Sequence, residues 1–550
     1  MYLPPWLYSV RGTLILDRGV HHERSGSTAI MAEKTENEES MEPMERKGKL
    51  TSTLLLVTLV ATIGSSFQYG YNVASVNSPA PYMKDFYNET FRQRYNESMS
   101  TDLSTILWSL TVSLYPLGGF FGSLMVGPLV TKIGRKGTLL LNNIFSIIPA
   151  ILMGTSVLAK SFEVIIFSRL VIGICAGLSS NVVPMYLGEM SPKNLRGGIG
   201  VMPQLLITIG ILIAQIFGIQ FILGNAHGWP ILLALTGIPA VMELIFLPLF
   251  PESPRYTLLH KGKEDEAKKA LQRLRGWDDV DSEIKEIYQE DQSEKAEGRL
   301  SVRNLCTFRP LRWQLISIIV INMGQQLSGI NAIYYYADTI YAQAGVPADT
   351  VQYVTVGTGS VNVLMTLAAT FIVDSWGRRL LLLLGFGICC ISSIVLTIAL
   401  VYQTTVSWLP YLSIACIIIY VIGHAIGPSS IPYVITTEMF RQASRPAAFM
   451  VAGSTHWLCN FIIGLIFEYM RIGLGSYCFI IFSGVCFVAF VFIFLVIPET
   501  KGKTFLEISQ IMAKKNGLEE ITDIKEFQDL NPLTKDTIPE KLDNAIMTPI

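Results

Sequence analysis

The sequence predicts an all-α membrane protein with twelve transmembrane helices in two pseudo-symmetric six-helix bundles, joined by a cytoplasmic helical linker. Three observations predict this fold: the composition, twelve apolar segments and a repeat of short charged motifs. Of the 550 residues, 50% are hydrophobic and 15% are charged, whereas soluble domains have about 25% charged residues. We therefore expect a lipid bilayer around the protein. The net charge of −1 provides no field for nucleic acid, which we do not expect as a partner.

The apolar segments are each close to the ~20 residues that a helix needs to cross the hydrocarbon layer. They lack the short alternating pattern of a membrane β-barrel. We place them at 52–74, 104–126, 137–158, 162–182, 199–221, 230–250, 312–335, 350–373, 379–401, 409–437, 446–468 and 474–497. The predicted domains are a disordered cytoplasmic tail at 1–50, a first bundle at 51–250, a helical linker at 251–310, a second bundle at 311–497 and a cytoplasmic tail at 498–550.

Basic residues predict the topology, because Lys and Arg favour the cytoplasmic side. The short connections after spans 2, 4, 8 and 10 hold nine of them, and those after spans 3, 5, 7, 9 and 11 hold only Lys160 and Arg471. Both termini are therefore predicted to be cytoplasmic, in a multi-pass protein of the plasma membrane. The first outer loop then carries two Asn-X-Ser/Thr glycosylation patterns, at Asn88 and Asn96. The eight cysteines suggest neither a disulfide framework nor a zinc site.

Short charged motifs repeat between the two groups of six spans. Gly-Arg-Lys at 134–136 returns as Gly-Arg-Arg at 377–379, and Pro-Glu-Ser at 251–253 returns as Pro-Glu-Thr at 498–500. Duplicated halves around a midplane site are typical of transporters that rock between two states. Opposite charges at partly dry helix ends attract strongly, so we predict a salt-bridge latch that holds the halves together on the cytoplasmic side. Its members are Arg135, Glu189, Arg196, Glu252, Arg378, Glu438, Arg445 and Glu499.

Uncharged polar residues gather on faces of otherwise apolar spans. At 100° per residue, Gln204, Thr208 and Gln215 share one face, and a second stripe follows Asn362. We expect spans 7 and 10 to break near Gly329 and near Gly427-Pro428, since broken helices mark transporter sites. His424 and His456 fall mid-span and are predicted to line the path. Arg169 and Glu243 also lie in spans, and we assign Glu243 no role.

This lining offers hydrogen bonds and almost no full charge, which suits a neutral polyhydroxyl solute, with Trp457 supplying an apolar face for its C–H side. A site for an amino acid or a phosphate would need charged side chains or open helix ends. A carrier of organic anions would need a cationic side chain in the middle of a span. The spans hold no metal set, no nucleophile with a base and no phosphate loop. We therefore expect neither an enzyme nor a cofactor.

The motifs together resemble the sugar-porter branch of the major facilitator superfamily over residues 50–515, and within it the facilitative hexose transporters (GLUT family). The motifs that carry the resemblance are Gln-Tyr-Gly-Tyr-Asn at 68–72, Pro-Glu-Ser-Pro-Arg at 251–255, Gln-Gln-Leu-Ser-Gly-Ile-Asn-Ala at 325–332 and Pro-Glu-Thr-Lys-Gly at 498–502. The resemblance implies the major facilitator fold. It also implies sugar-binding amides at Gln204, Gln325, Gln326, Asn331 and Asn362, and a pocket like that of the fructose branch at Tyr69, His424, Ser429, His456 and Trp457.

Two positions bear on the mode of transport and on the substrate. Proton symporters of the family carry Asp where this chain has Asn72, so the resemblance implies a uniporter for a hexose, with fructose favoured. Tyr433 departs from the fructose branch and is bulky, which keeps a dual glucose and fructose transporter open as an alternative. A proton-coupled symporter and a sugar sensor that moves no sugar also stay open.

Overall fold

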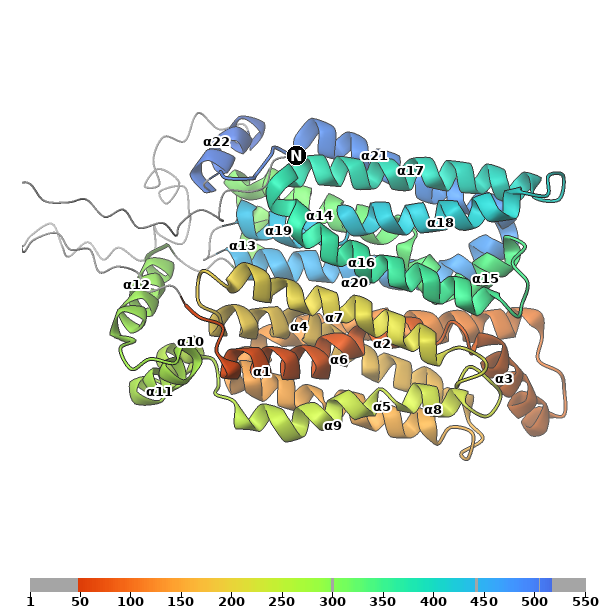
Figure 1. Cartoon of the computed structure of the whole chain (residues 1–550), viewed down its shortest axis with the longest axis horizontal. Helices are drawn as coiled ribbons and strands as arrows, with labels where there is room; N and C mark the ends of the chain where they lie inside the picture. Colours follow the sequence, from red (N-terminus) through yellow and green to blue (C-terminus); the bar gives the residue numbers. More distant parts are fainter. Residues whose placement is uncertain (1–47, 298–300, 441–443, 504, 517–550) are drawn as a thin grey trace, which may run out of the picture. The chain divides into compact units, whose positions relative to one another are not determined.

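The computed structural model describes residues 48–297, 301–440, 444–503 and 505–516, all of which belong to one compact unit. Helices make up the secondary structure of these residues, and no strand occurs among them. The predicted all-α class is therefore confirmed (Figure 1). Most of the tail predicted at 1–50, and the part of the second tail beyond residue 516, lie outside the described residues.

The helices of the first predicted bundle follow the apolar segments closely. Thr51 caps the first of them, because its side chain accepts a hydrogen bond from the N–H of Leu54. The elements are α1 (Ser52–Ala61), the π-helix η1 (Thr62–Ser66), α2 (Phe67–Ala74), α3 (Ala80–Tyr95), α4 (Thr101–Asn142), α5 (Ile144–Gly154), α6 (Phe162–Met190), α7 (Arg196–Phe217), α8 (Trp229–Ala234), α9 (Gly237–Phe246) and η2 (Leu247–Leu249).

The linker and the second predicted bundle complete the unit. The linker predicted at 251–310 contains helices, the longest of which are α11 and α12. The elements are α10 (Pro254–Leu259), α11 (Glu264–Arg275), α12 (Asp281–Glu297), α13 (Val302–Thr307), η3 (Arg309–Leu311), α14 (Arg312–Leu327), α15 (Ile330–Gln343), α16 (Val351–Trp376), α17 (Arg378–Tyr402), α18 (Leu409–Ile426), α19 (Ile431–Met439), α20 (Arg445–Leu474), η4 (Gly475–Tyr477), α21 (Cys478–Val496) and α22 (Phe505–Asn516).

Ten segments of the described residues are long and apolar enough to cross a membrane. Two of them, Thr101–Gly154 and Arg445–Val496, have 54 and 52 residues, and one crossing takes only about 17–25 residues. Each is also interrupted by a glycine with positive φ, at Gly134 (84°) and Gly475 (56°). Each of the two long segments is therefore assigned two crossings, which gives the twelve predicted.

Both predicted helix breaks are present. Span 7 stops at Leu327 and restarts at Ile330, with Gly329 between them at φ 105°. A Cβ atom at Gly329 would lie 2.6 Å from the ring of Phe482, so both the backbone conformation and the space require glycine. Span 10 stops at Ile426 and restarts at Ile431. Such breaks leave backbone groups without helical partners.

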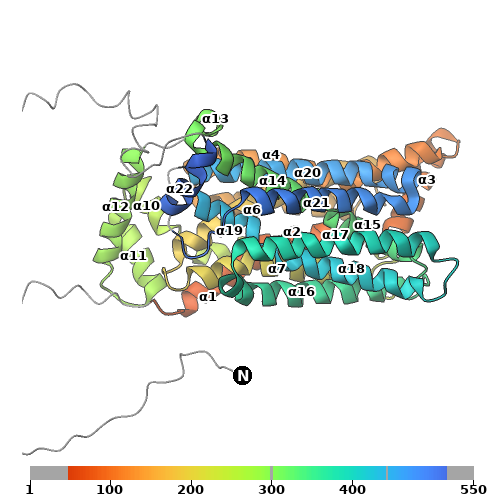
Figure 2. The ribbon, with the colours of Figure 1, turned by 90° about the horizontal axis from the view of Figure 1, so that it is seen from above.

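The spans lie alongside one another, and the two ends of the unit differ. Figures 1 and 2 show α10, α11, α12, α13 and α22 at one end, called here the linker end, and α3 at the opposite end, called the α3 end. Glycines let neighbouring spans approach closely. A Cβ atom at Gly118 of α4 would lie 2.0 Å from the carbonyl oxygen of Leu170 in α6. Across the predicted halves, Gly119 of α4 accommodates the ring of Trp457 in α20.

Candidate functional site

A hydrogen-bonded group of polar side chains joins the predicted halves near the middle of the spans. Nε2 of Gln204 on α7 donates to Oγ of Ser429 at 3.1 Å. Nε2 of Gln325 on α14 donates to the carbonyl oxygen of Ser429 at 3.0 Å. Ser429 lies in the break between α18 and α19, where its carbonyl is free of the helix. The break thus provides an acceptor that an unbroken helix would have used internally.

His456 on α20 is the second centre of this group. Its Nδ1 lies 2.9 Å from Nε2 of Gln326 and 3.3 Å from Oε1 of Gln325. Its Nε2 lies 3.4 Å from the hydroxyl of Tyr69 on α2. Nδ2 of Asn331 donates to Oε1 of Gln326 at 2.6 Å. Gly329, at the predicted break, lies between Gln326 and Asn331 in the chain.

The accessibility of these residues distinguishes two layers. Tyr69, Gln204, Ser429 and His456 are partly exposed, although they lie mid-span in a protein that lipid surrounds. The second layer is buried: Gln325, Gln326 and Asn331 are 7%, 4% and 6% exposed. These amides bond to Ser429 and His456 in the exposed layer or to one another. Amides, hydroxyls and an imidazole both donate and accept hydrogen bonds. The group can therefore exchange its internal bonds for bonds to a polar, uncharged solute.

Trp457 is a buried member of the predicted site. Its side chain is 1% exposed and packs beneath Tyr69, with ring centres 5.1 Å apart. Tyr69 and Gly119 cover the indole in this conformation, and its contact with a sugar stays a prediction. Here Trp457 forms a wall between α4 and α20.

Asn362 and His424 lie apart from the main hydrogen-bonded group. Nδ2 of Asn362 donates to the hydroxyl of Tyr334 at 3.0 Å. Within the part of the chain that the structure describes, Nε2 of His424 is buried without a hydrogen-bond partner. The carbonyl of His424 accepts from the N–H of Ser429 at 2.9 Å. Tyr334 was missed by the sequence analysis. Its position three residues after Asn331, nearly one helical turn, was the available signal.

The buried Arg169 has no carboxylate as a partner among the described residues. It is 0% exposed, and its Nη1 donates to the carbonyl oxygen of Asn72 at 2.9 Å. Its guanidinium also lies 4.6 Å from the centre of the Tyr115 ring. Nδ2 of Asn72 donates to Oγ1 of Thr236 at 2.7 Å. This cation therefore fixes the end of α2 through backbone carbonyls.

The predicted charged latch forms two matching clusters at the linker end, one in each half. Arg135 binds Glu189 at 2.8 Å, and Arg378 binds Glu438 at 2.9 Å. Ser253 donates to the same Glu189, and Thr500 donates to Glu438 at 2.5 Å. The repeat seen in the sequence is thus a repeat of geometry. Both described ion pairs stay within one half, so they do not join the halves in this conformation.

The other four predicted latch residues form no ion pair between the halves that the structure describes. Glu252 accepts from the N–H of Lys136 at 2.9 Å, and Glu499 accepts from the N–H of Arg378 at 2.9 Å. These carboxylates cap the helix that restarts after Gly134 or Gly377, because helix starts leave N–H groups unpaired. Arg445 donates to the carbonyl oxygen of Thr437 at 2.9 Å. Arg196 is exposed and forms no ion pair with any residue that the structure describes.

The two glycosylation candidates lie on α3, at the end opposite the linker. Asn88 is exposed within the helix, and its Oδ1 accepts from the N–H of Met99 at 3.3 Å. Asn96 is exposed at the end of the helix, with φ 57°. Their modification stays a prediction. All eight cysteines are free.

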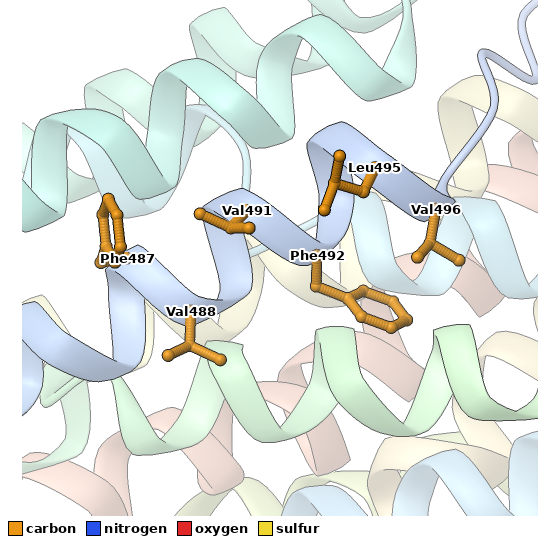
Figure 3. Close-up of a pocket in the computed structure, with 6 residues that line it drawn as sticks. All are labelled: Phe487, Val488, Val491, Phe492, Leu495 and Val496. Carbon is orange, nitrogen blue, oxygen red and sulfur yellow. The ribbon is translucent and has the colours of Figure 1, made fainter.

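A hollow on α21 is unrelated to this group of polar residues. Figure 3 shows the residues of α21 that line it, among them Phe487, Val491 and Leu495, and its volume is about 320 Å³. All six lining side chains are hydrocarbon. They offer no hydrogen bond to a polar solute, so the hollow suits the acyl chains of lipid.

Most of the chain matches a known protein family. Residues 57–512 match the family model described as "Sugar (and other) transporter". The chain is 62% identical, over 499 residues, to the solute carrier family 2, facilitated glucose transporter member 5 of Homo sapiens; the match covers 90% of this chain and 100% of that protein. It is 55% identical to member 7 of the same human family over 502 residues, which covers 91% of this chain and 98% of that protein.

Solved structures have the same fold. The proton:xylose symporter XylE of the major facilitator superfamily, bound to 6-bromo-6-deoxy-D-glucose, matches with a TM-score of 0.69 at 24% identity, over 84% of this chain and 100% of that one. The inward open conformation of XylE from E. coli matches with a TM-score of 0.69 at 23% identity, over 83% of this chain and 99% of that one. The predicted major facilitator fold is confirmed.

Proposed function

This chain belongs to the sugar transporter family, within solute carrier family 2, and we propose that it carries a hexose, with fructose favoured, by facilitative diffusion. The resemblance to the facilitative hexose transporters drawn from the motifs is confirmed by this membership. The protein is a multi-pass membrane carrier and not an enzyme. The proposed substrate class rests on one observation. The hydrogen-bonded side chains between Gln204 and His456 join the two halves, and none of them carries a full charge.

The chemistry of this group favours a sugar. A hexose presents hydroxyls on several sides, and each both donates and accepts a hydrogen bond. The side chains of Gln204, Ser429 and His456 are partly exposed and presently bond to protein partners. A sugar hydroxyl that enters between two such partners can accept a hydrogen bond from one and donate to the other, so both stay paired and the cost of an unsatisfied buried group is avoided. We assign the sugar-binding role to the ten residues predicted from the sequence: Tyr69, Gln204, Gln325, Gln326, Asn331, Asn362, His424, Ser429, His456 and Trp457.

Fructose is proposed over glucose because the pocket residues resemble those of the fructose branch. Tyr433, which kept dual selectivity open, is 47% exposed, and its ring centre lies 4.7 Å from that of Phe449. This aromatic contact gives the Tyr433 ring a partner that is not a member of the hydrogen-bonded group between Gln204 and His456. Glucose transport in addition to fructose transport is therefore an outcome that a competition experiment distinguishes.

The transport mode that we propose is uniport. A proton-coupled carrier needs a titratable group that both sides of the membrane reach in turn. Among the described residues, the contacts of Arg169 and Asn72 are with backbone carbonyls, a hydroxyl and an aromatic ring, and none is with a carboxylate. Asn72 lies where a carboxylate would be needed, so the sugar gradient alone supplies the driving force.

We also propose the placement of the protein in the membrane. The linker end carries the basic clusters around Arg135 and Arg378, and positive charge marks the cytoplasmic side. The α3 end then faces the outside of a plasma membrane, with both termini in the cytoplasm. We retain the division into two six-helix bundles at 51–250 and 311–497, which move against each other during alternating access.

Uptake by the purified full-length chain in proteoliposomes tests this function. Labelled fructose should equilibrate with saturable kinetics and without any ion gradient, and excess unlabelled fructose inside should accelerate its entry. Competition with excess glucose then separates a fructose carrier from a dual carrier. A protein that binds fructose but shows no flux would be a sensor, and the proposal would be wrong.

A further inference from the structure

The sequence repeat gives the contact between Gln204 and Ser429 a counterpart in the opposite halves. Residues 180–204 and 429–453 both begin with Ser and carry Glu and Arg at their tenth and seventeenth positions. The last position is Gln204 in the first segment and Gly453 in the second. Gln204 bonds to Ser429, the start of the second segment. The equivalent contact pairs Gly453 with the start of the first segment, and there the bridging amide side chain is missing.

An amide of the first half faces Gly453 at this place. A Cβ atom at Gly453 would lie 3.6 Å from Oδ1 of Asn181, which is the one atom described within 4 Å of it beyond its own stretch of helix. Asn181 follows the first residue of segment 180–204, and both Asn181 and Gly453 are partly exposed. The missing side chain therefore leaves an open space that the Asn181 oxygen borders.

The hydrogen bonds of Asn181 use its nitrogen and not its oxygen. Nδ2 donates to the carbonyl oxygen of Gly177 at 2.9 Å and to Oγ of Ser123 on α4 at 3.2 Å. It also lies 3.3 Å from Oγ of Ser180. Oδ1 accepts no hydrogen bond from any residue that the structure describes. The amide is thus fixed by its donors, and an oxygen that can accept two hydrogen bonds lies toward Gly453.

This oxygen lies one helical turn from the side chains already assigned to the sugar. Trp457 on α20 packs against α4 at Gly119. Gly453 lies four residues before Trp457, about 6 Å along α20 toward its start. Gly453 also lies three residues before His456, so the two share one face of the helix. Asn181 therefore continues the polar lining by one turn beyond His456.

We propose that Asn181 is a further sugar-binding residue, whose Oδ1 accepts a hydrogen bond from a hydroxyl of the hexose in the space beside Gly453. This inference rests on the proposed function, because it names an additional contact of the same transported sugar. Gln204 supplies the donor in the contact with Ser429. In the counterpart contact the repeat supplies no donor, and the sugar hydroxyl takes that role.

The experiment measures sugar binding by the full-length protein in lipid nanodiscs, through its intrinsic tryptophan fluorescence. The ligands are fructose and fructose derivatives that each have one hydroxyl replaced by fluorine, which keeps the size of the group but donates no hydrogen bond. The derivative that lacks the donor to Asn181 should bind the natural chain about fivefold more weakly than fructose does, the effect of one neutral hydrogen bond. Asn181→Ala should bind fructose about fivefold more weakly, and should bind that derivative as well as it binds fructose.

Gly453→Ser tests the same oxygen and leaves the bonds of Asn181 in place. The Cβ atom of the serine would lie 3.6 Å from Oδ1, so its hydroxyl reaches this acceptor and occupies it. We expect the same derivative to lose its penalty in this variant. Gly357→Ser on α16 is the matched control, because a Cβ atom there meets nothing within 4 Å. It should bind every ligand as the natural chain does.

The penalties of the derivatives decide the proposal. One derivative that loses its penalty in both variants supports the contact with Asn181. Penalties that stay the same in the natural chain and in both variants overturn it, because Asn181 then meets no sugar hydroxyl. If Asn181→Ala binds no ligand and melts at a lower temperature, the loss of its bonds to α4 has disturbed the fold, and Gly453→Ser alone decides.

The measurement also separates this inference from the proposed function. Binding requires no flux, so the loss of one penalty supports the role of Asn181 even if proteoliposomes move no hexose. Saturable hexose flux together with unchanged penalties supports the carrier and removes Asn181 from its site. A natural chain that binds none of these sugars would overturn both.

Discussion

Nε2 of Gln204 lies 3.1 Å from Oγ of Ser429, and this single hydrogen bond joins α7 to the break between α18 and α19. Both side chains are partly exposed. The bond must open whenever the two halves separate at this point. A sugar hydroxyl that bridges the two side chains would keep the connection while the halves move.

The first prediction concerns Gln204. Gln204→Ala removes the donor and should raise the KM for fructose about tenfold, since one hydrogen bond contributes about 1–1.5 kcal/mol and 1.4 kcal/mol corresponds to a factor of ten. The effect should appear mainly in the KM, because the role that we propose for Gln204 is to bind the sugar. Initial uptake rates in proteoliposomes measure the KM. Gln93→Ala, on the exposed face of α3, is the control and should leave the KM unchanged. An unchanged KM in Gln204→Ala as well would remove Gln204 from the site.

The second prediction concerns energy coupling. Because Arg169 pairs with the carbonyl of Asn72 and with no carboxylate among the described residues, an imposed proton gradient should not concentrate fructose. Proteoliposomes with an acidic outside should reach the same internal fructose concentration with and without a protonophore. Accumulation above the outside concentration that the protonophore abolishes would instead favour the symporter.

The sequence was most informative where only one residue type can adopt the required backbone conformation. Gly329 predicts a broken span, and the break is present because φ is positive there. The clusters around Arg135 and Arg378 were predicted from repeated motifs. Their partners were not, because a motif shows which charges lie at one end and not which pairs form. Glu252 caps a restarting helix, and this role needs the backbone geometry at Gly134.

Contacts between distant spans were the hardest to predict. Asp338 lies just past the end assigned to span 7, where the sequence gives no sign of a partner, whereas it binds Asn77 across the halves. Trp457 was predicted to face the sugar, whereas Tyr69 covers it. Helical periodicity places a side chain on one face, but the partner on that face depends on how the halves are closed.

The third prediction concerns the glycines that begin the repeated clusters. Gly134 has φ 84° and ψ 178°, and Gly377 has φ 90° and ψ 160°, a region that residues with a Cβ rarely adopt at a cost of about 1–3 kcal/mol. A Cβ atom would also lie 2.5 Å from Oε2 of Glu252 or 2.7 Å from Oε2 of Glu499. Gly134→Ala and Gly377→Ala should each lower the apparent melting temperature of the purified chain.

Gly357→Ala is the matched control for this prediction. Gly357 lies inside α16, where a Cβ atom would meet nothing within 4 Å. Alanine favours helix over glycine by about 1 kcal/mol, so this variant should keep or raise the melting temperature. Equal melting temperatures for all three variants and the natural chain would show that neither cluster depends on its glycine.

The last prediction concerns Glu243, a carboxyl group that is 0% exposed on α9. Its Oε2 accepts from Oγ of Ser65 in η1 at 2.8 Å, and a Cβ atom at Gly64 would lie 2.4 Å from the Cβ of Glu243. No cation pairs with it among the residues that the structure describes. Since a buried unpaired charge is costly, we expect a neutral acid that ties α9 to the π-helical turn of span 1.

Two substitutions separate this role from that of a buried charge. Glu243→Gln keeps the size and the hydrogen bonding of a neutral acid, so the apparent melting temperature and fructose uptake should both stay close to those of the natural chain. Glu243→Ala leaves Ser65 unpaired and opens a cavity beside Gly64, and should lower the melting temperature by about 5 °C. If Glu243→Gln instead abolishes uptake while its melting temperature is unchanged, the carboxyl group takes part in transport itself, because only the loss of a titratable proton distinguishes that variant from the natural side chain.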